Sequence, residues 1–331
     1  MTLARALVVA VLFCPFQDDE KITLRIATQC PQGTIWANGL AEMAKEVREK
    51  TKVKFRVFPG GILGDEALAA TKIGQHLLGG ALFSGPGMAA LLPEVRLVEV
   101  PFLCETDREI DGVRKEVEPD VTKHFAEKGL VFLGWTEFGW LHIFCKEKVK
   151  SLEELRKLKI WRPEGDALAE ELFKELGLTG STVPLPDVLS AIESGTIDAA
   201  CVTPVCAQGY QWHTKLKHLL RLPMGCVTGA LLLDKTEWEK ISEAARGTIA
   251  EIARRHLDKT VADARKLNTN VIPELEKEGV AVSVATDADI DECRKRGAAV
   301  AETMSADGKL YSRELLARAR KAVEKVRQEK K

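Results

Sequence analysis

A long apolar segment in the middle of the chain constrains the fold more than any other feature. Residues 130–146 read L-V-F-L-G-W-T-E-F-G-W-L-H-I-F-C-K, which is too long and too continuously apolar for an ordinary edge strand. The chain has 331 residues, enough for two domains that each bury a core of their own. We therefore predict that this segment is a strand that crosses between two lobes.

Strand and helix patterns alternate on both sides of that segment, which predicts an α/β protein. A strand–helix–strand unit in the first half recurs in the second half, so two lobes of like build are expected. Strands are expected at 22–28, 53–58, 81–83, 182–185 and 197–202, with a return strand at 229–233. Helices are expected at 36–50, 65–78 and 187–194, and long outer helices at 236–278 and from residue 312. We assign residues 21–139 and 228–268 to lobe I, and residues 140–227 and 269–331 to lobe II.

Residues 1–20 have the shape of a signal or lipoprotein-like leader. One early cation, Arg5, precedes a short apolar run, far shorter than the ~20 apolar residues that a membrane span needs. We expect export. Cys14 stands where a bacterial lipoprotein carries its lipidated cysteine, but Phe13 is bulkier than the residue usual before it, so lipidation and simple cleavage both stay open. A buried N-terminal strand or helix fits less well with the acidic residues 18–20.

Charge and cysteine content exclude several function classes. Lysine and arginine total 48 against 49 aspartates and glutamates, which leaves no basic surplus for a nucleic-acid partner. Of the 8 cysteines, an odd number remains without Cys14, and most lie in apolar runs, which argues against a disulfide framework. Cys201 and Cys206 near His213 leave a metal or redox site open, but no second pair has zinc spacing. We predict no cofactor and no metal.

Several segments occur in an order and spacing that resemble a known family. They are F-P-G-G-I-L-G-D-E at 58–66, E-V-P-F-L at 99–103, S-L-E-E-L-R-K-L-K-I at 151–160 and I-D-A-A at 197–200. From residue 21 onward the chain resembles the substrate-binding proteins of tripartite ATP-independent periplasmic (TRAP) transporters, of the dicarboxylate-receptor type. The resemblance implies a two-lobed periplasmic-binding-protein-like fold with crossing hinge strands, located in the periplasm and without catalytic activity. Such a receptor closes on a small-molecule ligand and delivers it to the membrane subunits of a permease.

The resemblance is greatest to one subgroup of that family. Its motifs are W-x-x-E-G-D, here at 161–166, L-P-D-V-L at 185–189 and Q-W-H-T-K at 211–215. Members of the subgroup resemble lipoproteins, and some work beside a helical-repeat (TPR-like) partner protein. The resemblance therefore implies such an anchor and such a partner here.

The chain departs from the family where a ligand carboxylate is usually bound. An arginine in the family's L-K-I-R segment falls on Trp161, and a second arginine on the crossing strand falls on Trp140. Indoles offer flat apolar walls with one donor each and no charge. We expect a mostly hydrophobic or amphipathic ligand. Arg162 should face away from the side chain of Trp161 on a regular strand, and a carboxylate ligand held by Arg162 is the alternative.

Further residues are expected to line the cleft. They are Trp36, Phe83, Ser84, Glu137, Phe138, Glu164, Thr203, Gln208 and Trp212. Glu164 and Asp166 are candidates for binding a cation or a ligand amine, and Asp166 alternatively caps the helix that begins at Ala167. An enzyme on the same fold is a lesser alternative, with Glu137, His142 and Asp166 as acid and base, but no nucleophile lies beside a base in a recognisable motif.

Overall fold

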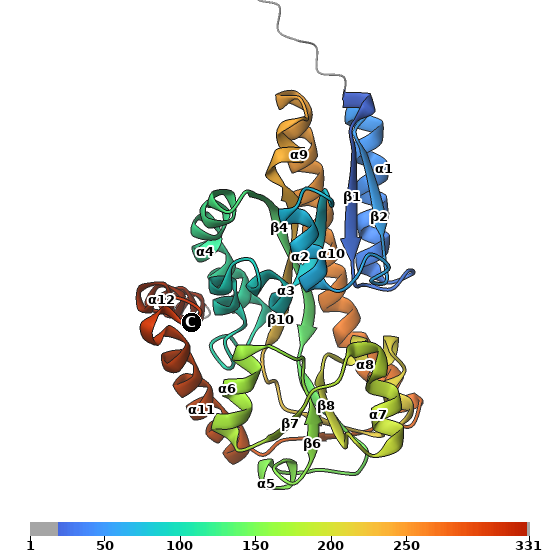
Figure 1. The fold of residues 1–331 in the computed structure, drawn as a ribbon. Helices are drawn as coiled ribbons and strands as arrows, with labels where there is room; N and C mark the ends of the chain where they lie inside the picture. The colour runs from blue at the N-terminus through green and yellow to red at the C-terminus, as the bar shows by residue number, and fades with distance from the viewer. Residues whose placement is uncertain (1–18, 330–331) are drawn as a thin grey trace, which may run out of the picture.

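A computed structural model of the protein describes residues 19–329 and contains two sheets, one in the upper and one in the lower half of Figure 1. The first sheet has the strand order β2-β1-β3-β10-β4, and the second β11-β9-β5-β8-β6-β7. The first comprises β1 (Thr23–Thr28), β2 (Lys54–Phe58), β3 (Gly80–Ser84), β4 (Leu130–Trp140) and β10 (Cys226–Asp234). The second comprises β5 (His142–Cys145), β6 (Lys159–Trp161), β7 (Thr179–Ser181), β8 (Ala199–Val202), β9 (His218–Arg221) and β11 (Ala281–Val284). The α/β, two-lobed fold class is confirmed.

The apolar segment 130–146 forms two strands that belong to different sheets. β4 pairs with β10 in the first sheet, β5 pairs with β8 and β9 in the second, and Leu141 lies between β4 and β5. At this point the backbone N–H of Leu141 donates to the carbonyl of Gly225 at 2.8 Å, and the N–H of Met224 donates to the carbonyl of Leu141 at 3.0 Å. These two connections between the sheets are therefore hydrogen-bonded to each other.

The strand predicted at 182–185 is wrong. β7 ends at Ser181, and a 3-10 helix, η3 (Leu185–Asp187), begins at the far end of the predicted strand. Proline has no N–H to donate to a sheet ladder, and Pro184 lies inside the predicted range. A strand is therefore not formed over this stretch.

Helices cover both sheets. The first long helix, α1 (Ile35–Thr51), is capped by Thr34 and buries a stripe that includes Trp36, Leu40 and Val47. The others are α2 (Glu66–Gly74), α3 (Gly85–Ala89), α4 (Asp107–Glu127), α5 (Leu152–Leu155), α6 (Ala167–Leu176), α7 (Val188–Ser194), α8 (Pro204–Gly209), α9 (Lys235–Glu239), α10 (Glu243–Lys277), α11 (Asp287–Ser305) and α12 (Arg313–Gln328). Further 3-10 turns are η1 (Asp19–Lys21), η2 (Pro93–Glu99), η4 (Trp212–Thr214) and η5 (Ala306–Gly308). No helix within residues 19–329 is both long and apolar enough to cross a membrane.

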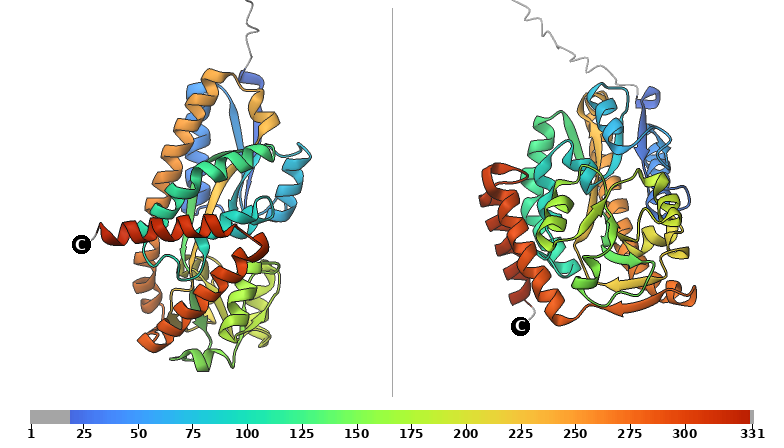
Figure 2. Two further views of the ribbon diagram at one scale, coloured as in Figure 1. Left: turned by 90° about the vertical axis from the view of Figure 1, so that its left-hand side faces the viewer. Right: turned by 60° about the horizontal axis from the view of Figure 1, so that its bottom comes forward.

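The last helix lies beside the first sheet rather than with the second. α11 packs against α6, and α12 continues across to pack against α4 on the same flank of the molecule (Figure 2). Arg318 of α12 links this helix to α4, because it donates to Glu116 at 2.8 Å and to Asp120 at 2.6 Å. The division into lobes stays a prediction; within the range 269–331 assigned to lobe II, α12 packs against α4 of the predicted lobe I.

Candidate ligand-binding cavity

A cavity of about 790 Å³ lies where the two sheets meet. The last residues of four strands line it, namely Thr28 of β1, Ser84 of β3, Trp161 of β6 and Val202 of β8. In α/β proteins, ligands bind outside the carboxyl ends of parallel strands, and both parallel pairs, β1 with β3 and β6 with β8, end here. The topology thus places the carboxyl ends of both sheets around one site.

Aromatic rings contribute to the cavity wall. Trp36 and Phe138 lie with ring centroids 5.2 Å apart, and the edge of Trp161 meets Trp212 at 5.0 Å. Tyr210 stacks on Trp212 at 5.6 Å. The indole N–H of Trp36 donates to the carbonyl of Glu137 at 2.8 Å, and that of Trp161 to the carbonyl of Val183 at 3.1 Å. Because the protein already satisfies both donors, the small part of these two buried indoles that reaches the cavity is apolar.

Arg96 is a buried cation on the inner wall that the sequence analysis missed. Its Nη2 donates to both oxygens of Asp166, at 2.9 and 3.0 Å, and its Nη1 lies 3.0 Å from Glu99 Oε2. Its Nε and Nη1 atoms are sealed from solvent. The guanidinium therefore directs its charge at two protein carboxylates rather than at the cavity. The sequence does contain one indication of a buried ion pair here: Arg96 and Glu99 lie three residues apart in the otherwise apolar run V-R-L-V-E-V.

Arg162 also lines the cavity, and it too has a protein partner. Its Nη2 donates to Glu170 Oε1 at 2.9 Å, and its Nη1 to the carbonyl of Pro163 at 3.2 Å. Its side chain lies against Gly180 of β7, away from the Trp161–Trp212 contact. This agrees with the expectation that Trp161 and Arg162 point in different directions, although both reach the cavity lining.

Two glutamates line the same wall, and both were missed. Glu66 accepts hydrogen bonds from the backbone N–H of Ser84 at 2.6 Å and from its hydroxyl at 2.5 Å. Glu99 accepts from the N–H of Thr228 at 2.5 Å and from its hydroxyl at 2.9 Å. Burial raises the pKa of both carboxyls, although the hydrogen bonds to each, and Arg96 beside Glu99, act in the opposite direction. Glu66 ends the G-D-E motif at 64–66, but nothing in that pattern indicates where its side chain points.

The structure brings together most of the residues expected at the cleft. The cavity lining includes Trp36, Ser84, Phe138, Trp161, Arg162, Thr203, Gln208 and Trp212. Phe83, Glu137, Trp140 and Glu164 are not part of that lining. Phe83 is fully buried in the core, because alternation on β3 turns it away from its neighbours Leu82 and Ser84. Glu164 is exposed beyond the end of β6.

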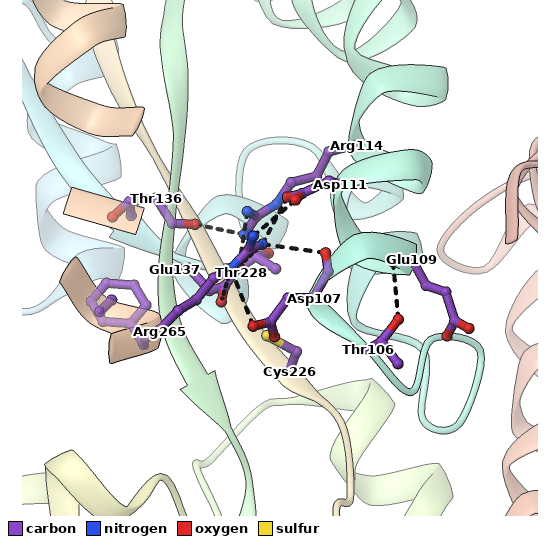
Figure 3. Close-up of polar contacts among 12 residues, drawn as sticks. Thr106, Asp107, Glu109, Asp111, Arg114, Thr136, Glu137, Cys226, Thr228 and Arg265 are labelled. Carbon is purple, nitrogen blue, oxygen red and sulfur yellow. Dashed lines mark hydrogen bonds and ion pairs between the residues drawn. The ribbon is translucent and has the colours of Figure 1, made fainter. Parts of the chain in front are cut away.

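Glu137 and Trp140 face away from the cavity. Glu137 lies between two arginines, with Arg114 Nη1 at 3.0 Å and Arg265 Nη2 at 2.8 Å from Oε2 (Figure 3). The pairing of β4 with β10 skips Phe138, and such a bulge shifts the facing of the residues beyond it. As a result, the indole of Trp140 donates to Asp107 at 2.9 Å, next to Arg265 and on the side of Glu137. Only one of the two indoles expected in place of arginines reaches the cavity.

The alternative sites do not assemble in the structure. Of Glu137, His142 and Asp166, only Asp166 lines the cavity, so the three form no acid–base group. Asp166 caps α6, as expected, by accepting from the N–H groups of Leu168 and Ala169 at 3.2 Å. His213 contacts Glu278 at 2.7 Å rather than the nearby cysteines. Within residues 19–329, no cluster of three or more histidine, cysteine, aspartate or glutamate side chains is placed to bind a metal. Cys14 lies outside the described residues.

Comparison with known proteins gives one consistent result. The family model described as "Bacterial extracellular solute-binding protein, family 7" (DctP) matches residues 26–307. An uncharacterized protein of Haemophilus influenzae is 25% identical over 278 residues, which cover 79% of this chain and 81% of that protein. The 2,3-diketo-L-gulonate-binding periplasmic protein YiaO of Escherichia coli is 27% identical over 157 residues, 46% of this chain and 47% of that protein.

Solved structures share the fold over most of the chain. The crystal structure of a TRAP periplasmic solute binding protein from Desulfovibrio salexigens, with bound orotic acid, superposes with a TM-score of 0.85. It is 18% identical, and the match covers 92% of this chain and 100% of that one. At this identity the likeness establishes the architecture, and the cavity described above occupies the junction of its two sheets.

Proposed function

Since the chain belongs to the DctP family of TRAP-type extracytoplasmic solute-binding proteins, family 7, we propose that its cavity receives a mostly hydrophobic or amphipathic small molecule. The family is one of solute-binding proteins, which is consistent with a receptor rather than an enzyme. In this proposal the two lobes close on the ligand and deliver it to the membrane subunits of a permease. The helical-repeat partner stays a prediction from the sequence resemblance alone.

One observation carries the choice of ligand class. Both arginines in the cavity lining have carboxylate partners within the protein: Arg96 contacts Glu99 and Asp166, and Arg162 contacts Glu170. A ligand carboxylate would have to displace one of these partners, and a displaced carboxylate loses a charge-assisted hydrogen bond. The aromatic rings, in contrast, offer contact area without such competition.

A carboxylate ligand is the second candidate, and relatives favour it. The name of the relative YiaO includes 2,3-diketo-L-gulonate, and the structure from Desulfovibrio salexigens contains bound orotic acid; both compounds have a carboxyl group. Arg162 is the residue that would hold such a ligand here, after release of Glu170, which is largely exposed. The two candidates therefore differ in whether Arg162 contributes to affinity.

Native mass spectrometry of the protein purified without added ligand, followed by solvent extraction, tests the ligand class. We expect an apolar or amphipathic molecule to be released. Trp161→Ala should weaken binding of that molecule by on the order of 1 to 3 kcal/mol, because a stacking wall is lost. Trp140→Ala is the matched control, since that indole contacts Asp107 outside the cavity. Recovery of a small carboxylate whose affinity falls in Arg162→Ala would overturn the proposal in favour of the second candidate.

We also propose that residues 1–20 direct export and that Cys14 anchors the mature protein. The named relative YiaO and the structural neighbour are periplasmic proteins, which supports the export part. Mass spectrometry of the mature chain from membrane and soluble fractions measures both steps. A mature chain that begins after residue 14 and carries no lipid would refute the anchor and leave the receptor proposal intact.

A further inference from the structure

The inner wall of the cavity has more carboxyl groups than cations. Glu66, Glu99 and Asp166 line it together with Arg96. The guanidinium of Arg96 contacts Glu99 and Asp166, whereas no cationic side chain within residues 19–329 forms an ion pair with Glu66. The hydrogen bonds to Glu66 come from the N–H and the hydroxyl of Ser84. Glu66 is therefore the carboxyl group of this wall without an ion-pair contact among residues 19–329, and burial raises its pKa.

Local sequence holds the two glutamates close to the backbone around α3. A Cβ added at Gly85 would collide with the carboxylate of Glu99, and one added at Gly87 would collide with that of Glu66. Glycines at these two positions thus make room for both carboxyl groups on either side of the same helical turn. Both residues line the cavity, but Glu99 is buried, whereas Glu66 is partly exposed. Of the two, Glu66 is the more accessible residue.

A ligand cation would supply the missing charge. An isolated carboxylate away from water is unfavourable unless it is paired and hydrogen-bonded, and an ammonium group brings both a positive charge and three donors. Ser84 is held at 2.5 Å from Glu66, and its side chain also lines the cavity. The Ser84 hydroxyl and the Glu66 carboxylate together present acceptors for one such group, next to apolar walls that suit the rest of an amphipathic molecule.

We propose that Glu66, with Ser84, is the polar anchor of the cavity and binds the protonated amine of an amphipathic ligand. This inference rests on the proposed function, because the aromatic walls must hold the apolar body of the ligand. It assigns the chemical class of the head group, which the aromatic walls alone leave open. It also makes Glu66 a specificity-determining residue.

Three compounds with an apolar chain of the same length and different head groups test the anchor at Glu66 separately from the apolar cavity. Isothermal titration with decylamine, decanol and decanoate at pH 7.5, below their micellar concentrations, measures the head-group preference of the full protein. We expect decylamine to bind about tenfold or more tightly than decanol, since hydrogen bonds to charged groups are the stronger ones, and decanoate to bind most weakly. Glu66→Gln should remove the amine preference and leave decanol affinity within about twofold, because decanol makes no charged contact.

The variant is suited to this test because glutamine keeps the shape of the side chain. Its amide oxygen can accept from the N–H of Ser84, and its amide nitrogen can donate to the hydroxyl, so the local structure is retained. Glu164→Gln is the matched control, since it removes an exposed charge outside the cavity lining and should leave all three affinities unchanged.

Two results would overturn the inference: one leaves the proposed function intact, and the other refutes it as well. Equal affinity for the three decyl compounds, or an amine preference that survives in Glu66→Gln, refutes the anchor while the apolar cavity stands. Binding of none of the decyl compounds, with binding of orotate or another small carboxylate, refutes the anchor and the proposed function together.

Discussion

Replacing Asp166 with asparagine should lower the free energy of unfolding by about 3 kcal/mol. Asp166 contacts Arg96 through both oxygens, and the two side chains are 8% and 6% exposed. Removing one partner of a buried ion pair typically costs about 3–5 kcal/mol, because the remaining charge is left uncompensated. We take the lower end of this range because Glu99 still lies 3.0 Å from the guanidinium.

The choice of asparagine separates two roles of Asp166. Asparagine is as good an N-cap as aspartate, so the hydrogen bonds from Leu168 and Ala169 at the start of α6 should persist. Asp166→Ala loses the cap as well and should cost about 1 kcal/mol more. In the double variant Arg96→Leu/Asp166→Asn neither member of this pair is left as an unpaired charge, and Glu99 loses its partner as it does in Arg96→Leu alone. Its destabilisation should therefore fall short of the sum of the single effects by about 2 kcal/mol.

Urea unfolding, followed by both circular dichroism and tryptophan fluorescence, measures these differences. Coincident transitions from the two signals are needed before a single free energy is assigned. A cost for Asp166→Asn within about 0.5 kcal/mol of zero would show that the ion pair contributes little. Additivity of the single effects within about 0.5 kcal/mol would show that Arg96 and Asp166 are not coupled. Either result would refute the reasoning from burial and contact.

Three other measurements test the packing. Burial holds the pKa of His142 at about 4, so stability should fall by about 2–3 kcal/mol between pH 6.5 and 4.5 as the unfolded state gains the proton. His142→Leu should lack this part of the decline; identical declines would contradict the assignment. Gly85→Ala should destabilise by about 1–3 kcal/mol, because its methyl group meets Glu99. Gly74→Ala, with open space around it, should be neutral or stabilising in the same unfolding assay; equal costs at both glycines would exclude the collision.

The sequence predicts the fold well wherever one face of an element is apolar. The helix at 36–50 was found because Trp36, Leu40 and Val47 recur at helical spacing, and these residues are buried in α1. The crossing segment was found because its apolar run is long. The strand predicted at 182–185 is wrong because it includes Pro184, which has no N–H to donate to a ladder.

The cavity was harder to predict, because it depends on contacts between distant parts of the chain. Arg96 and Asp166 are 70 positions apart, and neither residue indicates the other in the sequence. The side of the sheet on which Trp140 lies could not be predicted, because side chains alternate between the two sides only on a regular strand. The pairing of β4 with β10 skips Phe138. Trp161 was found through the family's arginine position, and its neighbour Trp212 contacts it directly.

The hydrogen bonds around Leu141 bear on the entropy of ligand binding. Two connections that run side by side, joined from Leu141 to Gly225 and Met224, restrict how far the sheets can move relative to each other. Two halves joined by one loose linker would lose much of their relative freedom when a ligand bridges them, and that loss would weaken binding. Here part of this freedom is already lost when the chain folds, and the closing motion proposed above is what remains. Ordering the two halves therefore costs a ligand less affinity than it would with a loose linker.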